Sequence, residues 1–399
     1  MSDWKNNKEI QLFREYLRIP SVHPNIDYTP CVEFLNKQSK DLGLTVEICY
    51  PGGPTKPIVI MTWLGQQPEL ASIMLNSHMD VVPVYPEKWS HPPFAAEMDE
   101  QGRIFARGSQ DMKCVGMQYL AAIRALKKKG ATFKRTIHVT FVPDEEISGV
   151  LGMKCFVQTD NFRKLNVGFC LDEGIASVKD EYAVYYAEKT IWYVHFTISG
   201  TTGHGSLLHK NTAAQKFQYI LGKMLELRKR AESLLSSDRS LELGNVSTVN
   251  LTVVKGGLQN NVIPPVIKAT FDLRLGIHED LEALQKQLKV WCDEAGGDIT
   301  IKFPTQDKKI PATVINETNP YWVGMQNAMK KLGLKVRTAV LPGVTDSRYV
   351  RQMNIPALGF SPMTNTPILL HDNDEYLQAD TYLRGIEIYE NILPGIANA

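Results

Sequence analysis

The sequence predicts an α/β protein in which a small βαββαβ domain interrupts a larger domain. Amphipathic helices alternate with short apolar strands from the start of the chain to about residue 186, the rhythm changes near Glu188, and the first pattern returns after Pro304. A chain of 399 residues is also about twice the length of one ordinary domain. We expect the larger domain over residues 1–187 and 306–399, and the inserted domain over residues 188–305.

The first part of the chain supplies helix and strand candidates in turn. Phe13 and Leu17 fall on one helical face, and Thr29 followed by Pro30 is a favourable start for a second helix. A third amphipathic helix is expected over about residues 117–126. Between these helices lie short apolar runs, some of the kind that is buried on both faces of a sheet. The strand candidates are Thr45–Tyr50, Pro57–Leu64, Ser72–Asn76, Thr136–Val142 and Val167–Leu171.

The segment from 188 to 305 has the element order of a ferredoxin-like fold. TIWYVHFTI, beginning at Thr190, alternates as a strand, a helix is expected over Thr212–Ser233, and NVSTVNLTVV and VIKATFDLRL follow as two successive strands. A helix over Glu279–Glu294 and the strand DITIKF complete the βαββαβ order. The α/β pattern then resumes with a helix near Pro320–Leu332, strands at Lys335–Leu341 and Ala357–Phe360, and a final helix near Asp380–Leu393.

Composition excludes several classes of protein. Hydrophobic residues at 43% and charged residues at 22% are typical of a folded globular chain and argue against disorder or a coiled coil. A net charge of +1 gives no whole-molecule field to attract nucleic acid or an anionic membrane, so neither is an expected partner. The six cysteines form no CxxC pair, and the sequence shows neither a leader-like start nor an apolar run of about 18 residues. We therefore expect a soluble, cytoplasmic protein with reduced cysteines.

Acidic residues and histidines recur just past the carboxyl ends of the predicted strands, which is the edge of an open α/β sheet where ligands bind. His78 follows the strand at Ser72–Asn76, and Asp80, two positions later, can hydrogen-bond the far ring nitrogen of His78. Asp111 precedes a helix, where the positive end of the helix dipole favours an anion. The other candidates are Asp144, Glu145 and Glu146 of FVPDEE, Asp172 and Glu173 of LDEG, and His371 of PILLHDNDE.

Each of these residues alone has a simpler explanation as a loop histidine, a helix N-cap or a solvated acidic turn. Together they favour a metal, because carboxylates that meet at one sheet edge repel one another unless a cation or protons neutralise them. Two imidazoles and three carboxylates without a thiolate suit catalytic Zn²⁺, Co²⁺ or Mn²⁺. Five ligands and one spare acid fit two ions bridged by a carboxylate, with the spare acid as base. The residues alone leave open whether Glu145 or Glu146 is that base.

Five motifs in order, LNSHMDVVPV, ARGSQDMKC, FVPDEE, LDEG and LLHDNDE, resemble those of the di-zinc aminoacylase and carboxypeptidase family. That family includes acetylornithine deacetylases, glutamate carboxypeptidases and carnosinase-like dipeptidases. The segments WSHPPF, CLDEGIAS, TDSRY and PALGFSP are most similar to its aminoacylase branch. The resemblance implies a zinc-peptidase-like α/β catalytic domain with an inserted dimerisation domain. It also implies hydrolysis of N-acyl-L-amino acids, typically N-acetyl, to a free L-amino acid and a carboxylate.

The resemblance also implies roles for individual residues. Asp111 would bridge two zinc ions, which Co²⁺ or Mn²⁺ could replace, and Asp80 would be the carboxylate behind His78. Glu145 would be the general base, taking a proton from a water shared by the zinc ions and returning it to the leaving amine. The implied zinc ligands are His78, Asp111, Glu146, Glu173 and His371.

Three further residues are implied to act on the substrate. His204 in SGTTGHGS would reach the partner subunit's active site in a homodimer made by the inserted domains, and would stabilise the oxyanion of the tetrahedral intermediate. Asn261 in GGLQNNVIPP would contact the substrate, and Arg348 in TDSRY would hold its α-carboxylate. Without the resemblance, His204 and Asn261 are turn residues and Arg348 forms a surface ion pair. Many family members have a proline shortly after this histidine, whereas SLLHKNTA follows here, as in the aminoacylase branch.

Two other functions remain open from the sequence. A dipeptidase or carboxypeptidase would use the same two-metal site, because only the substrate pocket differs. A metal-binding protein that kept the fold and lost catalysis is the second alternative, since a fold does not dictate function. The intact Glu145 argues against this second alternative, because loss of the base is the simplest route to an inert protein.

Overall fold

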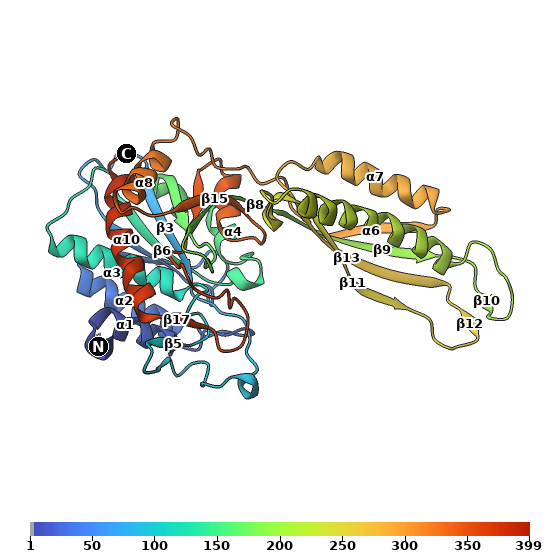
Figure 1. The fold of residues 1–399 in the computed structure, drawn as a ribbon, viewed down its shortest axis with the longest axis horizontal. Helices are drawn as coiled ribbons and strands as arrows, with labels where there is room; N and C mark the ends of the chain where they lie inside the picture. Colours follow the sequence, from blue (N-terminus) through green and yellow to red (C-terminus); the bar gives the residue numbers. More distant parts are fainter. Residues whose placement is uncertain (1–3) are drawn as a thin grey trace. The chain divides into compact units, whose positions relative to one another are not determined.

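The computed structural model describes residues 4–399, and their contacts divide the chain into two compact units (Figure 1). Unit 1 comprises the chain up to Tyr186 together with Thr313–Ala339 and Thr345–Ala399. Unit 2 comprises Ala187–Ala312 and Val340–Val344. The α/β class predicted from the sequence is confirmed.

An eight-stranded sheet runs through the centre of unit 1. Its strands are β1 (Thr45–Cys49), β2 (Ile58–Trp63), β3 (Ser72–His78), β6 (Ile137–Val142), β7 (Val167–Asp172), β8 (Tyr182–Glu188), β15 (Val336–Leu341) and β16 (Ala357–Gly359). They lie in the order β1-β2-β6-β3-β7-β16-β8-β15, and the middle strands β6, β3, β7 and β16 are parallel. Every residue of β3 and β6 is buried, as expected of parallel strands that are covered on both faces of a sheet.

Helices cover both faces of this sheet. One face packs against α1 (Lys8–Leu17), α2 (Thr29–Leu42), α3 (Lys113–Lys128), α8 (Pro320–Lys331) and α10 (Ala379–Ala397), and the other against α4 (Met153–Phe156), α5 (Asp160–Lys164) and α9 (Ser347–Gln352). Along β2, Val59 and Met61 belong to the first core, whereas Ile58 and Ile60 belong to the second. Because side chains alternate along a strand, unit 1 has one apolar core on each side of the sheet.

The helix boundaries follow from local sequence. The α2 helix ends at Gly43, which adopts a left-handed conformation with φ of +60° that a glycine takes without steric cost. The α8 helix begins with Pro320 after Asn319, whose side chain accepts hydrogen bonds from the N–H groups of Tyr321 and Trp322. These caps account for the predicted start of this helix near Pro320.

A three-stranded sheet in unit 1 was not predicted from the sequence. It contains β4 (Glu97–Met98), β5 (Arg103–Phe105) and β17 (Tyr376–Gln378), in the order β17-β5-β4. Tyr376 pairs with Phe105 in antiparallel register. This pairing brings the segment that follows His371 next to the segment that precedes Asp111. Short 3-10 helices complete the unit at η1 (Trp4–Asn6), η2 (Pro86–Lys88) and η3 (Glu145–Ile147).

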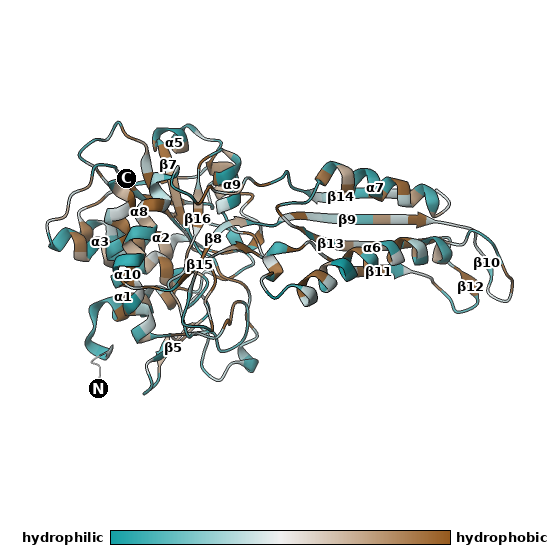
Figure 2. Ribbon diagram, turned by 45° about the horizontal axis from the view of Figure 1, so that its top comes forward, coloured by the Kyte–Doolittle hydropathy of each residue, from teal (hydrophilic) through white to brown (hydrophobic). Residues whose placement is uncertain are grey.

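Unit 2 has the predicted βαββαβ order. Its elements are β9 (Thr190–Ser199), α6 (Ala213–Ser237), β11 (Thr248–Gly256), β13 (Val266–Leu275), α7 (Leu281–Glu294) and β14 (Ile299–Gln306), with η4 (Leu243–Asn245) before β11. The antiparallel sheet has the order β11-β13-β9-β14, as in a ferredoxin-like fold. Ile220 of α6 and Leu288 of α7 pack with Phe196 and Phe271 of the sheet. Along β9, apolar and polar residues alternate, which is visible as colour bands in Figure 2.

Two short strands extend the loops of unit 2. They are β10 (Gly203–His204) and β12 (Val262–Ile263), and His204 pairs with Val262 in antiparallel register. The N–H of Gly205 donates to the carbonyl oxygen of Asn261 at 2.7 Å. Figure 1 shows this two-stranded sheet in long loops beyond the ends of β9 and β13. His204 and Asn261, which are distant in the sequence, therefore lie side by side.

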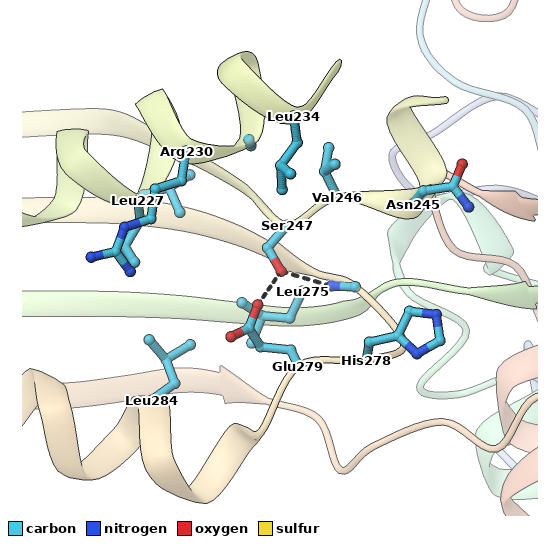
Figure 3. Close-up of a pocket in the computed structure, with 13 residues that line it drawn as sticks. Leu227, Arg230, Leu234, Asn245, Val246, Ser247, Leu275, His278, Glu279 and Leu284 are labelled. Atoms are coloured by element: carbon cyan, nitrogen blue, oxygen red, sulfur yellow. Dashed lines mark hydrogen bonds between the residues drawn. The ribbon is translucent and has the colours of Figure 1, made fainter. Parts of the chain in front are cut away.

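A pocket of about 280 Å³ lies in unit 2 between α6 and α7 (Figure 3). Apolar side chains such as Leu227 and Leu284 line it, and the hydroxyl of Ser247 donates to Oε2 of Glu279 at 2.5 Å. The described residues that line this pocket fall between positions 227 and 284 of the sequence, and none of them is a predicted site residue. The candidate site is therefore elsewhere.

Among residues 4–399, no helix combines the length and the apolar composition that are needed to cross a membrane. All six cysteines are free, and four of them are buried.

His138 on β6 is a buried imidazole that should make stability depend on pH. It is 7% exposed, and its Nδ1 lies 2.9 Å from Oγ1 of Thr62. Burial lowers the pKa of His138 from 6.5 to about 4. Because the unfolded chain takes up the proton first, stability that is present above pH 6.5 is lost as the pH falls toward 4. This linkage predicts that the free energy of unfolding falls by about 2 kcal/mol between pH 7 and pH 5.

Urea unfolding of the wild type and of His138→Gln at both pH values measures this contribution. Both proteins keep every other titratable group, so the difference between their pH dependences isolates His138. We expect the variant to lose about 2 kcal/mol less than the wild type on acidification. Equal losses in the two proteins would show that His138 does not titrate in this way.

Candidate metal centre

The parallel strands of unit 1 bring the predicted site residues to one edge of the sheet. His78 is the last residue of β3 and lies level with Val142, the last residue of β6. Asp172 is likewise the last residue of β7. The segments that follow β6 and β7 carry Glu145 and Glu173, so these acids reach the same edge as His78.

Asp111 lies between the two predicted histidine ligands, with one carboxylate oxygen facing each imidazole. Its Oδ1 is 3.0 Å from Nε2 of His78, and its Oδ2 is 3.3 Å from Nε2 of His371. Each imidazole also has a carboxylate of its own. Oε2 of Glu173 lies 3.8 Å from Nε2 of His78, and Oε2 of Glu146 lies 3.0 Å from Nε2 of His371. The five predicted ligands therefore form two groups of three that share Asp111.

The ionisable groups of this cluster perturb one another strongly. Burial and the charge of Glu173 raise the pKa of Glu145 well above its ordinary value, and burial and Asp111 do the same to the pKa of Glu173. Burial, together with Asp111, raises the pKa of Glu146 to about 7. Hydrogen bonds to Asp111 and Glu146 raise the pKa of His371 to about 10. The protein alone therefore holds protons on this cluster, and a bound cation would replace them.

These residues fit a metal ion. Three of the predicted ligands, His78, Asp111 and Glu146, place their donor atoms within 4.8 Å of one another. The same holds for His78, Glu173 and Glu145, of which Glu145 is the predicted base and the other two are predicted ligands. Oε1 of Glu146 is buried and has no hydrogen-bond partner in the described part of the chain, as expected of an oxygen that awaits a ligand. Imidazole and carboxylate donors without a thiolate suit Zn²⁺, Co²⁺ or Mn²⁺.

Asp80 supports the cluster by contacts that the sequence did not reveal. Nδ1 of His78 lies 2.8 Å from the backbone carbonyl oxygen of Asp80 and 3.6 Å from the carboxylate Oδ1, whereas the sequence predicted the carboxylate as its partner. The carboxylate instead accepts the N–H groups of Glu145 and Glu146 at 3.1 and 3.0 Å and lies 2.9 Å from Nε2 of His23. Asp80 therefore orients His78 through its main chain and the glutamate turn through its side chain.

The first acid of FVPDEE is separated from the other two. Asp144 has a φ of +63°, and its carboxylate accepts the hydroxyl of Tyr28 at 2.8 Å and pairs with Nζ of Lys56 at 2.6 Å. Neither Lys56 nor His23 was a candidate, because their partners lie 88 and 57 residues away in the sequence. No local pattern marks such residues.

Arg348 lies in α9 of unit 1 and is 1% exposed, so it is not the surface ion pair that its sequence allowed. Its Nη2 donates to the carbonyl oxygen of Ser148 at 2.8 Å, and its guanidinium carbon lies 4.6 Å from the ring centre of Tyr349. Ser148 follows the turn that carries Glu145. The two remaining predicted residues, His204 and Asn261, belong to unit 2, where β10 and β12 place them together.

Comparison with known proteins identifies the family. The family model described as peptidase family M20/M25/M40 matches residues 74–394. This chain belongs to peptidase family M20/M25/M40. Among M20 relatives, aminoacylase-1 of Homo sapiens is 44% identical over 397 residues, which cover 99% of this chain and 96% of that protein. Aminoacylase-1 of Dictyostelium discoideum is 41% identical over 100% of both chains. The family and branch predicted from the motifs are confirmed.

Solved structures share the fold of this chain. The aminopeptidase PepT from Bacillus cereus superimposes with a TM-score of 0.76 at 20% identity, covering 98% of each chain. The Bacillus subtilis YXEP protein, a dinuclear metal binding M20 peptidase, superimposes with a TM-score of 0.70 at 16% identity, also over 98% of each chain. At these identities the likeness shows the fold alone.

Proposed function

We propose that this M20 family protein hydrolyses N-acyl-L-amino acids, typically N-acetyl, to a free L-amino acid and a carboxylate. The observation that carries the proposal is the position of Asp111 between two imidazoles, each with its own carboxylate. This arrangement suits two ions that share one ligand. The identity of 41–44% to aminoacylase-1 over nearly the whole chain selects the acylated amino acid as the substrate class.

We propose zinc as the metal, with Co²⁺ or Mn²⁺ as substitutes. His78 and Glu173 would hold one ion, His371 and Glu146 the other, and Asp111 both. When bound, two such ions polarise the acyl carbonyl and lower the pKa of water. Asp80 keeps His78 and the glutamate turn in place.

Glu145 is the proposed general base. It takes a proton from the attacking water as the new C–O bond forms, and it gives that proton to the leaving nitrogen as the amide C–N bond breaks. Its backbone N–H is fixed by the carboxylate of Asp80, which keeps the turn in place while the side chain exchanges the proton. Burial and the charge of Glu173 raise the pKa of Glu145 in the metal-free protein. Two bound cations would lower this pKa again, so that the carboxylate could accept the proton from water.

Arg348 is the proposed partner of the substrate α-carboxylate. A guanidinium held by the Ser148 carbonyl and the Tyr349 ring is preorganised for such a pair. We expect Arg348→Ala to lower kcat/KM for N-acetyl amino acids roughly ten- to a hundredfold, because a charged hydrogen bond contributes about 1.5–3 kcal/mol. Steady-state kinetics on N-acetyl amino acids and their carboxyl-amidated forms measure this. An equal loss on the amidated substrates would contradict the assignment.

Amino-acid release from N-acetyl amino acids and from matched dipeptides tests the proposed reaction. The acylated amino acids should be hydrolysed with the higher kcat/KM, and a chelator should abolish both activities. A clear preference for dipeptides would make the protein a peptidase that uses the same metal centre. No hydrolysis of either class by metal-loaded protein would favour an inert homologue.

Unit 2 is the proposed dimerisation domain, over the predicted residues 188–305. β11 is an edge strand of its sheet, and Val253 and Val254 on this strand are 40% and 50% exposed. Such an edge can pair with its twin around a twofold axis. His204 would then stabilise the oxyanion in the partner subunit's site, with Asn261 beside it on the substrate.

Mixing of two inactive variants tests this shared site. Heterodimers of His204→Ala and Glu145→Gln contain one site with Glu145 from the first chain and His204 from the second. We expect partial activity to return in proportion to the fraction of these heterodimers. If activity stays absent although subunit exchange is verified by mass spectrometry, His204 does not act across subunits.

A cytoplasmic location is part of the proposal. The six free cysteines suit a reducing compartment, and a net charge of +1 does not favour a nucleic acid or an anionic membrane as partner. The proposed partners are therefore the small-molecule substrate and a second copy of the chain. Cell fractionation with an antibody to the native protein measures the location.

A further inference from the structure

Two distant segments of unit 1 meet beside the candidate metal centre. Residues 107–111 end with Asp111, and residues 367–376 contain His371. The antiparallel pairing of β5 with β17 brings them together, and the N–H of Ala106 donates to the carbonyl oxygen of Glu375 at 3.0 Å. Both ligands nevertheless lie outside the strands, so this pairing alone does not fix their side chains.

Glu375 holds the first segment with its side chain. It is fully buried, and its carboxylate accepts five hydrogen bonds from residues 107–111. The donors are Nη1 of Arg107 at 2.7 Å, the N–H of Gly108 at 3.1 Å, the hydroxyl of Ser109 at 3.4 Å, and the N–H groups of Gln110 at 2.6 Å and Asp111 at 3.3 Å. The backbone of Asp111 is therefore attached directly to the segment that carries His371.

This arrangement requires a carboxylate. An ionised Glu375 offers only acceptors, which matches five converging donors, and the charge of Arg107 balances it at 2.7 Å. Gly108 has a φ of +87°, a left-handed conformation that favours glycine and lets successive N–H groups point toward one anion.

Gln110 holds the second segment in return. It is 1% exposed, and its Nε2 donates to the carbonyl oxygens of Pro367 at 3.1 Å and Tyr376 at 2.8 Å. Its Oε1 accepts the N–H of Leu369 at 3.1 Å. Gln110 thus binds the loop of His371 at both ends, while Glu375 binds the loop of Asp111 along its length. We call Gln110 and Glu375 the clasp.

We infer that the clasp positions Asp111 and His371 for metal binding, with Glu375 as its main positioning residue. His371 has a side chain that is 55% exposed and a left-handed φ of +62°, so it depends on its loop for its position. Asp111 serves both groups of ligands, so a shift of its backbone disturbs both. The inference rests on the metal centre of the proposed function and is independent of the substrate.

Glu375→Gln tests the clasp without changing its size. The amide NH₂ of the new glutamine faces donors that need an acceptor, so some of the donors in residues 107–111 lose their hydrogen bond. We expect the metal affinity of the folded, chelator-stripped protein to fall about ten- to a hundredfold, as for other groups that orient metal ligands. Co²⁺ titration followed by its absorption spectrum, and Zn²⁺ competition with a chromophoric chelator, measure this. Glu375→Asp keeps the charge and should recover part of the affinity.

Glu9→Gln is the matched control. It breaks the Glu9–Arg124 pair, a partly buried Arg–Glu contact elsewhere in unit 1, with Oε2 of Glu9 2.5 Å from Nη1 of Arg124. This control should keep wild-type metal affinity even where it lowers the unfolding temperature of the metal-free protein. If Glu375→Gln behaves in the same way, Glu375 has only a structural role and the inference is overturned.

A second variant reaches the clasp from the other side. Gln110→Ala removes the contacts to the His371 loop and should also weaken metal binding, which keeps the test decisive if Glu375→Gln does not fold. Wild-type affinity in a folded Gln110→Ala would then overturn the inference.

If the clasp variants weaken metal binding but the wild type hydrolyses no N-acyl amino acid, the inference stands and the proposed function fails. If the wild type hydrolyses them and both variants keep full metal affinity, only the inference fails.

Discussion

Glu145→Gln is expected to lower kcat on N-acetyl amino acids by a factor of about 10²–10⁴ and to leave the metal content unchanged. The amide cannot accept a proton from water, but it has the same size, and the hydrogen bond from the backbone N–H of Glu145 to Asp80 remains. Steady-state kinetics together with elemental analysis measure both quantities.

The control for this variant is Glu97→Gln. Glu97 is an exposed acid of unit 1 that pairs with His91 at 2.8 Å, away from the predicted ligands. The Glu97→Gln variant should keep the wild-type kcat. If Glu145→Gln instead loses metal, Glu145 is a ligand and its division of roles with Glu146 is wrong.

Asp111→Ala is expected to bind neither metal ion and to lose activity roughly 10³-fold or more, because a catalytic metal contributes several kcal/mol to the transition state. The reason is that Asp111 reaches both imidazoles, at 3.0 and 3.3 Å. His371→Ala removes a ligand from one group only, so about one equivalent of metal should remain. Metal counting after gel filtration checks the stoichiometry.

Asp372→Asn is the matched control for these variants. Asp372 follows His371 in the same exposed loop, and its carboxylate accepts the N–H of Asn373 at 2.8 Å. The Asp372→Asn variant should bind two metal ions and keep full activity. Two bound ions in Asp111→Ala would contradict the shared position of this carboxylate.

Local patterns in the sequence predicted most of the fold. VIKATFDLRL coincides with β13 at Val266–Leu275, and the helix expected over Thr212–Ser233 is α6 at Ala213–Ser237. Thr212 and Gln215 form a capping box at the start of this helix, which is a signal within four residues. The convergence of the acids at one sheet edge was also predictable, because parallel buried strands end together.

Contacts between distant segments could not be predicted in this way. β5 and β17 are short strands paired across about 270 residues, and neither has a distinctive pattern. Glu375 lies in the run HDNDE, which resembles a solvated acidic loop, although its carboxylate is buried against a segment 265 residues earlier. The choice between the carbonyl and the carboxylate of Asp80 as partner of His78 depends on atomic positions that residue spacing does not fix.

The most direct test of the central claim is a Zn²⁺ titration of chelator-stripped protein. Amino-acid release from an N-acetyl-L-amino acid and the amount of bound metal are measured in the same samples. The two groups of ligands that share Asp111 predict negligible hydrolysis without metal and maximal hydrolysis when two ions are bound per chain. Full activity in metal-free protein would contradict the two-metal site. Protein that holds two ions and hydrolyses no N-acyl amino acid would contradict the proposed reaction.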